Sequence, residues 1–254
     1  MRIALNAVTE VGTRAGKILL AERGLDALGL YGNESAGRGA DRKVMAIRDV
    51  AGFDVLVSDD TAITSALAGI AAEDGLAFVT TDDHIDEDVL DRFAAAGTTL
   101  LIGANVATGL APALASHEST RVDTVLRTTV AWTIPGTPRR RGVVVPFPEP
   151  IGPRWAASRR RQRRAAHRRH EVPIRGDWAG ATVIVDGIDQ GREVERVIGV
   201  ADHKEHLAAL CLAAAVIAVA EGSYGPGLHR PADRPADYLS AALRVGLGVA
   251  TYTE

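Results

Sequence analysis

The chain has 254 residues, of which 46% are hydrophobic and 24% charged, and its formal net charge is −3. This composition is typical of folded globular proteins, and a chain of this length can bury a core without disulfides or metals. The single cysteine, Cys211, excludes an internal disulfide and favours a reducing, cytoplasmic location. The longest apolar run, 207–220, is shorter than the roughly 20 residues of a membrane span, and no secretory signal is expected at the N-terminus.

The first half alternates short apolar runs with segments of helical composition. We expect strands at 2–8, 28–31, 53–58, 76–81 and 98–102, and helices at 13–22, 62–72 and 86–96. Strands separated by helices require crossover connections, which predict a parallel sheet covered by helices on both faces. The runs lack strict polar alternation, as expected for strands buried on both sides. Ligands of such sheets bind beyond the carboxyl ends of the strands.

The turn after the first strand is the candidate phosphate site. Dinucleotide-binding turns use glycines so that the backbone can approach a diphosphate, which the first helical amides then bind. On that spacing Asn6, Thr9 and Gly12 take the three glycine positions, so only Gly12 is a glycine. We expect these residues and Thr13 to bind the diphosphate, whereas Glu10 would repel it. The alternative is an ordinary α/β turn that binds no nucleotide.

The segment after the second strand is expected to contact the adenosine ribose of the cofactor. Asn33, Ser35 and Arg38 are suited to a 2′-phosphate, and Glu34 to a free ribose. This composition slightly favours NADP over NAD. The alternative is a glycine-rich loop with no ligand.

Acidic residues follow the third and fourth strands. We expect Asp59 to contribute to the cofactor site, Thr81, Asp82 and Asn105 to face the nicotinamide, and Asp82 or His84 to carry a proton. The alternative is that the acids only cap the helices that follow them. No diagnostic ligand spacing is present, so we expect no metal.

A family resemblance supports the dinucleotide-binding interpretation. The order of elements in 1–118 resembles the NAD(P)-binding domain of dihydrodipicolinate-reductase-like enzymes. The stretch 102–110 is similar to the G-x-G-V-N-P-G-F segment of diaminopentanoate-dehydrogenase-like proteins: Gly103, Val106 and Gly109 match, and Ala107, Thr108 and Leu110 depart. The resemblance implies a Rossmann-like doubly wound sheet and a nicotinamide cofactor. The reductases' catalytic H-H-x-x-K-x-D-x-P-S-G-T segment is absent, so their substrate is not implied.

The second half is expected to be a smaller α+β domain with a largely antiparallel sheet. Strands are predicted at 121–132, 142–147, 181–185 and 193–200, followed by one long apolar helix at 203–221. This helix is expected to lie between a sheet and a partner, which favours a homo-oligomer. We predict a cofactor domain at 1–118, a substrate and oligomerisation domain at 119–222, and a C-terminal segment, 223–254, that returns to the first domain.

Charge is unevenly distributed along the chain. Residues 119–175 carry 14 basic and 3 acidic side chains, whereas residues 1–118 carry 9 basic and 18 acidic ones. We interpret the arginine-rich loop 154–175 as a solvated arm or as a surface that pairs with the acidic N-terminal region, with a phosphate-bearing ligand as the alternative. Nucleic-acid binding is disfavoured because no recognition motif accompanies the arginines.

Together these features predict an NAD(P)-dependent oxidoreductase that acts on a small metabolite. Arginines of the basic loop favour an anionic substrate. The alternative is a non-catalytic nucleotide- or metabolite-binding protein on the same fold, which the missing glycines and Glu10 favour.

Overall fold

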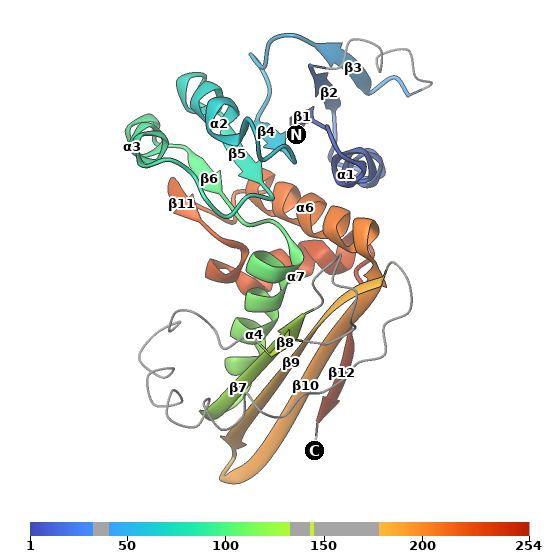
Figure 1. The fold of residues 1–254 in the computed structure, drawn as a ribbon, viewed down its shortest axis with the longest axis vertical. Helices are drawn as coiled ribbons and strands as arrows, with labels where there is room; N and C mark the ends of the chain where they lie inside the picture. Colours follow the sequence, from blue (N-terminus) through green and yellow to red (C-terminus); the bar gives the residue numbers. More distant parts are fainter. Residues whose placement is uncertain (33–40, 133–142, 145–177, 254) are drawn as a thin grey trace.

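A computed structural model describes residues 1–32, 41–132, 143–144 and 178–253. It contains a seven-stranded sheet and a five-stranded sheet, with helices on and between them (Figure 1). The first sheet is parallel throughout and the second antiparallel throughout. The predicted fold class, a Rossmann-like doubly wound sheet followed by a smaller α+β domain, is therefore confirmed.

The N-terminal elements alternate as predicted, with one additional strand. They are β1 (Arg2–Asn6), α1 (Glu10–Leu20), β2 (Ala27–Tyr31), β3 (Val44–Ile47), β4 (Val55–Ser58), α2 (Thr64–Glu73), β5 (Ala77–Thr80), α3 (Glu87–Ala96) and β6 (Thr99–Leu101). The spatial order is β11-β6-β5-β4-β1-β2-β3. The order reverses between β1 and β4, so the crevice beyond their carboxyl ends is the expected ligand site.

Both faces of the first sheet are buried. Ile3 and Leu5 of β1 belong to one hydrophobic cluster with α1 and α6, while Ala4 between them belongs to a second cluster with α2 and α3. Figure 1 shows these two pairs of helices on opposite sides of the sheet. The strands therefore read as continuous apolar runs because successive side chains enter two different cores.

A helical connection leads to the second sheet. It consists of a π-helical turn, η2 (Val106–Leu110), and α4 (Ala111–Ser119). The strands are β7 (Thr124–Trp132), β8 (Val143–Val144), β9 (Trp178–Asp189), β10 (Arg192–His203) and β12 (Ala250–Thr253), in the order β12-β10-β9-β7-β8. The β9–β10 hairpin is longer than predicted because its loop is only Gln190 and Gly191, which both have positive φ and suit a tight turn.

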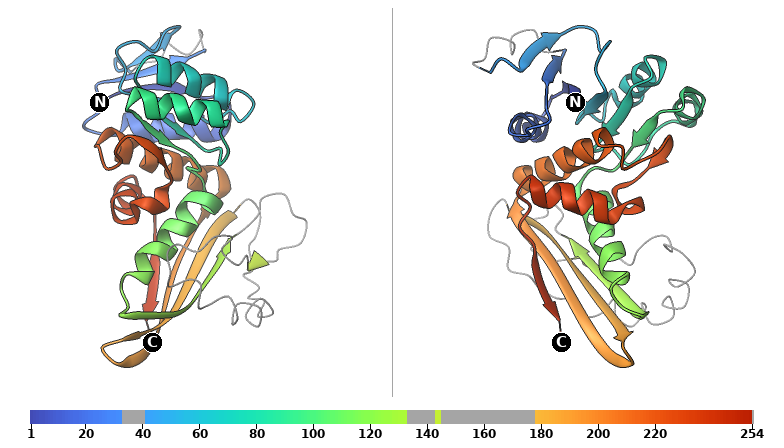
Figure 2. Two further views of the ribbon diagram at one scale, coloured as in Figure 1. Left: turned by 90° about the vertical axis from the view of Figure 1, so that its left-hand side faces the viewer. Right: turned by 180° about the vertical axis from the view of Figure 1, so that it is seen from behind.

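The long apolar helix α6 (Lys204–Ala220) lies between the two sheets, as both views in Figure 2 show. It packs against α1, β4 and β5 on the side of the first sheet, against β9 and β10 on the side of the second, and against α7. Twelve of its residues are buried. Its apolar surface is thus covered within a single chain, so its burial does not require the partner subunit that the sequence suggested. No helix among the described residues is long and apolar enough to cross a membrane.

The C-terminal segment contributes to both sheets. Strand β11 (Gly227–His229) pairs with β6 of the first sheet, and η4 (Pro231–Asp233) and α7 (Pro235–Arg244) follow it. Strand β12 then pairs with β10 of the second sheet. The segment 223–254 was predicted to return to the first domain: β11 does so, but β12 does not, because the free edge of β10 offers backbone groups that this extended strand satisfies.

Candidate functional site

The candidate site lies where β1 and β4 end at the switch point. Asn6 is the last residue of β1 and pairs in register with Ser58, the last residue of β4. The turn from Ala7 to Thr9 and the loop that begins at Asp59 therefore leave the sheet side by side. The turn leads directly into α1.

The carboxylate of Asp59 occupies the mouth of this turn. Its Oδ1 accepts a hydrogen bond from the Val8 amide at 2.9 Å. Its Oδ2 accepts from the amides of Thr9 at 3.1 Å and Gly12 at 2.7 Å, and from the Thr9 hydroxyl. Only 6% of Asp59 is exposed. Four donors at the start of one helix therefore converge on a single buried anion. We call these donors, the amides of Val8, Thr9 and Gly12 and the hydroxyl of Thr9, the anion cradle.

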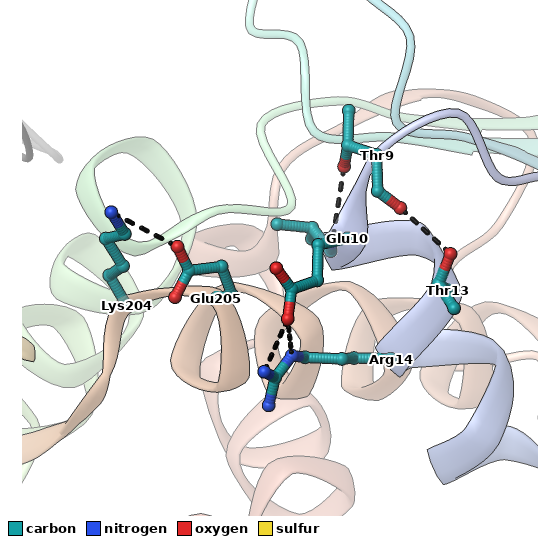
Figure 3. Close-up of polar contacts among 7 residues, drawn as sticks. Thr9, Glu10, Thr13, Arg14, Lys204 and Glu205 are labelled. Atoms are coloured by element: carbon teal, nitrogen blue, oxygen red, sulfur yellow. Dashed lines mark hydrogen bonds and ion pairs between the residues drawn. The ribbon is translucent and has the colours of Figure 1, made fainter. Parts of the chain in front are cut away.

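Thr9 has two structural roles in the anion cradle. It is the N-cap of α1, and its Oγ1 accepts from the Val11 amide at 3.1 Å while the hydroxyl donates to Asp59. This cap explains why α1 starts at Glu10, earlier than predicted. The Thr13 hydroxyl, which we expected in the phosphate site, instead donates to the Thr9 carbonyl at 3.1 Å (Figure 3).

Gly12 is required by the close approach of Asp59. A Cβ at position 12 would lie 2.5 Å from Asp59 Oδ2, 2.7 Å from its Cγ and 3.0 Å from the Ala7 Cα. The only glycine of the predicted motif is thus the residue whose missing side chain admits an anion to the helix amides.

Asn6 is buried at the opposite edge of the turn. It is 7% exposed, and its Oδ1 has no hydrogen-bond partner among the described residues. A Cβ on Gly32, which follows β2, would lie 3.7 Å from Asn6 Nδ2. The carboxamide therefore lies between the ends of β1 and β2. The predicted ribose and 2′-phosphate contacts Asn33, Ser35 and Arg38 lie outside the described residues.

The donors of the anion cradle fit a phosphate group. Backbone amides at a helix start and a hydroxyl are the groups that bind phosphates in this fold class, and here the Asp59 carboxylate stands in for the phosphate. Glu10, which we expected to repel a phosphate, is paired with Arg14 one turn along α1, with its Oε1 2.9 Å from Arg14 Nε (Figure 3). Arg14 therefore offsets the charge of Glu10.

A second group of predicted residues meets where β5 and β6 end. The Asn105 carboxamide donates to the Thr81 carbonyl at 2.8 Å and accepts from the Thr108 amide at 2.9 Å. The Gly103 amide donates to the Asp82 carbonyl. The structure therefore brings Thr81, Asp82 and Asn105 together, but both ends of the Asn105 side chain are already engaged: Nδ2 ties its loop to the loop of Thr81, and Oδ1 caps η2 in its own segment.

Tight backbone packing explains two glycines of the segment that resembles the dehydrogenases. Gly103 has a φ of +70°, which disfavours other residues. A Cβ on Gly109 would lie 2.4 Å from the Gly103 carbonyl oxygen. These matches therefore follow from the shape of the β6–α4 connection.

The predicted proton carriers lie at the rim of the sheet. Asp82 Oδ1 accepts from the His84 amide at 3.2 Å, and His84 itself is exposed. In the same way Asp60 Oδ1 accepts from the Ala62 amide at 3.0 Å before α2. Both acids form turns that precede helices, but neither caps the helix as the alternative expected: the N-caps of α2 and α3 are Ile63 and Asp86, and neither helix start has a side-chain cap hydrogen bond. Asp59 differs because it binds the start of α1 rather than the helix that follows it.

Two charged residues that the sequence analysis did not single out lie near this turn. Lys204 and Glu205 begin α6, which packs against α1, and their Nζ and Oε1 atoms are 3.2 Å apart (Figure 3). Among the described residues, no group of three or more His, Cys, Asp or Glu side chains is placed to hold a metal ion.

Cys211 is buried inside α6, as the sequence suggested. Burial raises the pKa of its thiol from 9.0 to about 12. Between these values the unfolded chain loses a proton that the folded chain keeps, so stability should be unaffected below pH 9 and decrease as the pH rises above it. We expect this thiol to lower the free energy of unfolding by up to about 1.4 kcal/mol for each pH unit in that range. Urea unfolding at pH 8–11 measures the slope, which should be smaller in Cys211→Ala; an equal slope would contradict the assignment.

No protein-family profile and no curated protein matches this sequence, but solved structures do. A meso-DAP dehydrogenase variant of Clostridium tetani, solved with DAP, is 15% identical, with a TM-score of 0.56 over 94% of this chain and 95% of that one. A dipicolinate-bound dihydrodipicolinate reductase from Paenisporosarcina is 8% identical, with a TM-score of 0.54 over 90% and 97%. A homospermidine synthase from Legionella pneumophila in complex with NAD is 9% identical, with a TM-score of 0.56 over 100% and 91%.

The chain has the fold of two-domain Rossmann oxidoreductases. The resemblance inferred from the order of the elements is confirmed at the level of the fold. At these identities it carries no residue roles over to this chain.

Proposed function

We propose that this chain is an NAD(P)-dependent oxidoreductase that acts on a small metabolite. The observation that carries the proposal is the anion cradle at the switch point of the sheet, where amides of Val8, Thr9 and Gly12 converge on one anionic group. The similar fold of a homospermidine synthase solved with NAD supports it.

The residues of the site would have distinct tasks. Thr9 and Gly12 would bind the diphosphate, with Asn6 beside it, and Thr81, Asp82 and Asn105 would shape the nicotinamide end of the crevice. The nicotinamide supplies hydride transfer when bound. Asp82 or His84 would donate or accept the proton at the exposed rim. Arginines of the loop 154–175, outside the described residues, would bind an anionic substrate.

Cofactor binding tests this function. Calorimetry with NADPH and NADH should detect binding at about 1 mM cofactor or below. If Arg38 binds the 2′-phosphate, Arg38→Ala should weaken NADPH more than NADH; equal losses would remove the preference for NADP. No binding of either cofactor, by the natural chain or by an Asp59→Ala variant, would remove the oxidoreductase proposal.

A non-catalytic binding protein is the second candidate. It is favoured by Asp59, which occupies the anion cradle, by the absence of glycine at positions 6 and 9, and by the acidic residue Glu10. Binding of a phosphate-bearing ligand without any hydride transfer to or from the nicotinamide, across a panel of small oxo- and amino-acids, would support this candidate over the first.

Further proposals rest on the sequence. We propose a cytoplasmic homo-oligomer with the domain boundaries 1–118, 119–222 and 223–254. Size-exclusion chromatography with light scattering tests the oligomer. We expect no retention on DNA at about 50 mM salt, and strong salt-dependent retention would instead favour the nucleic-acid alternative.

A further inference from the structure

We propose that Asp59 is an internal competitor for the anion cradle, and that a diphosphate-bearing ligand enters only when the Asp59 side chain leaves. This inference rests on the proposed function and adds a residue that sets the affinity and selectivity of the same site. The competing groups are a carboxylate of the chain and a phosphate of the ligand.

The two anions cannot share the anion cradle. Asp59 Oδ2 is 2.7 Å from the Gly12 amide nitrogen and 3.1 Å from that of Thr9. A phosphate oxygen bound by the same amides would have to occupy the same position. Two negative charges in contact in a buried site also repel strongly. Binding therefore requires displacement of Asp59.

The surrounding loop can remain in place when Asp59 moves. Its course after β4 is held by other bonds: the Asp60 amide donates to Ser58 Oγ at 3.1 Å, and the Thr64 hydroxyl donates to the Asp60 carbonyl at 2.7 Å. The bonds between this loop and the turn that begins α1 come from the Asp59 carboxylate. The proposal therefore requires the Asp59 side chain to move and does not require the loop backbone to rearrange.

Asn6 gives independent support for a ligand at this place. Its buried Oδ1 lacks a hydrogen-bond donor among the described residues, although buried polar atoms are nearly always paired. The arrangement with Asp59 inside therefore leaves an acceptor unsatisfied at the edge of the turn. A hydroxyl-bearing ligand that follows the diphosphate toward β2 would supply that donor.

Competition by Asp59 lowers the apparent affinity of the site for a diphosphate. The apparent affinity equals the intrinsic affinity multiplied by the fraction of chains in which the Asp59 side chain has left the anion cradle. A single carboxylate on a ligand has no advantage over Asp59, whereas a diphosphate offers more charge and more acceptor oxygens. The site is therefore expected to select diphosphates and to exclude simple carboxylic acids.

Calorimetry with inorganic pyrophosphate and with NADPH, on the natural chain and on Asp59→Ala, tests the proposal. Asp59→Ala should bind pyrophosphate roughly tenfold or more tightly than the natural chain. Asp83→Ala is the matched control, because it removes an exposed acid near the same edge that has no bond to the turn. It should leave the affinity unchanged. If Asp59→Ala does not fold, Asp59→Ser provides the same comparison.

The outcomes separate this inference from the proposed function. If Asp59→Ala gains pyrophosphate affinity but binds neither cofactor, the competition stands and the oxidoreductase proposal fails. If both proteins bind NADPH equally, the oxidoreductase proposal stands and the competition is wrong. If the variant gains no affinity for pyrophosphate, the competition is also overturned.

Discussion

Replacement of Gly12 by alanine is expected to lower the free energy of unfolding by about 2–4 kcal/mol, because it expels the buried Asp59 carboxylate from the three amides that bind it, of which that of Gly12 is itself buried. The new Cβ would lie 2.5 Å from Asp59 Oδ2, and the backbone of Ala7 at 3.0 Å limits any shift of the turn. The higher helix propensity of alanine offsets only about 1 kcal/mol of this loss. The same Cβ would block a phosphate, so binding of pyrophosphate and of either cofactor should be lost.

Urea unfolding measures the first effect and calorimetry the second. Gly69→Ala in α2 is the matched control, since its Cβ would meet only the Arg92 guanidinium, at 3.4 Å, and that side chain is flexible. This control should be neutral or stabilising by up to about 1 kcal/mol. A Gly12→Ala protein as stable as the natural chain would show that Asp59 does not approach the helix as described.

Much of the fold could be predicted from local patterns. The strands of the first half were found because each is an apolar run bounded by a turn and followed by a helical segment. Strand β3 was missed because it lies at the sheet edge, where Met45 is 37% exposed, so its sequence shows no buried run. Strand β11 has three residues and pairs with β6 more than 120 positions earlier, which no local pattern can indicate.

The sequence predicts which residues form the candidate site better than it predicts what each of them contacts. The rule that ligands lie beyond strand ends selected Asn6, Thr9, Gly12 and Asp59, which the structure brings together. The sequence alone cannot show that Asp59 reaches a turn about 50 positions earlier, because an acid after a strand is expected to cap the next helix. The contacts of Asn105 were hidden for the same reason, since its partner Thr81 belongs to another loop.

Replacement of Arg196 by methionine is expected to destabilise the protein by about 3–5 kcal/mol, because it leaves a buried carboxylate without its counter-ion. Glu118, near the end of α4, is 2% exposed, and its Oε2 lies 2.8 Å from Arg196 Nε on β10. Arg121 is the other nearby cation, with its Nη1 4.0 Å from Glu118 Oε1, and it is half exposed. The position of Glu118 at a helix C-terminus adds to the cost of its charge.

A double variant separates the loss of the ion pair from the loss of packing. In Glu118→Leu combined with Arg196→Met the unpaired charge is absent, so most of the stability should return. Arg92→Met removes an exposed arginine paired with Glu73 and should cost less than about 1 kcal/mol. Urea unfolding of the natural chain, Arg196→Met, the double variant and Arg92→Met tests these expectations. Equal losses for Arg196→Met and Arg92→Met would mean that Glu118 is hydrated in solution, and the joint between α4 and the second sheet would then not depend on this ion pair.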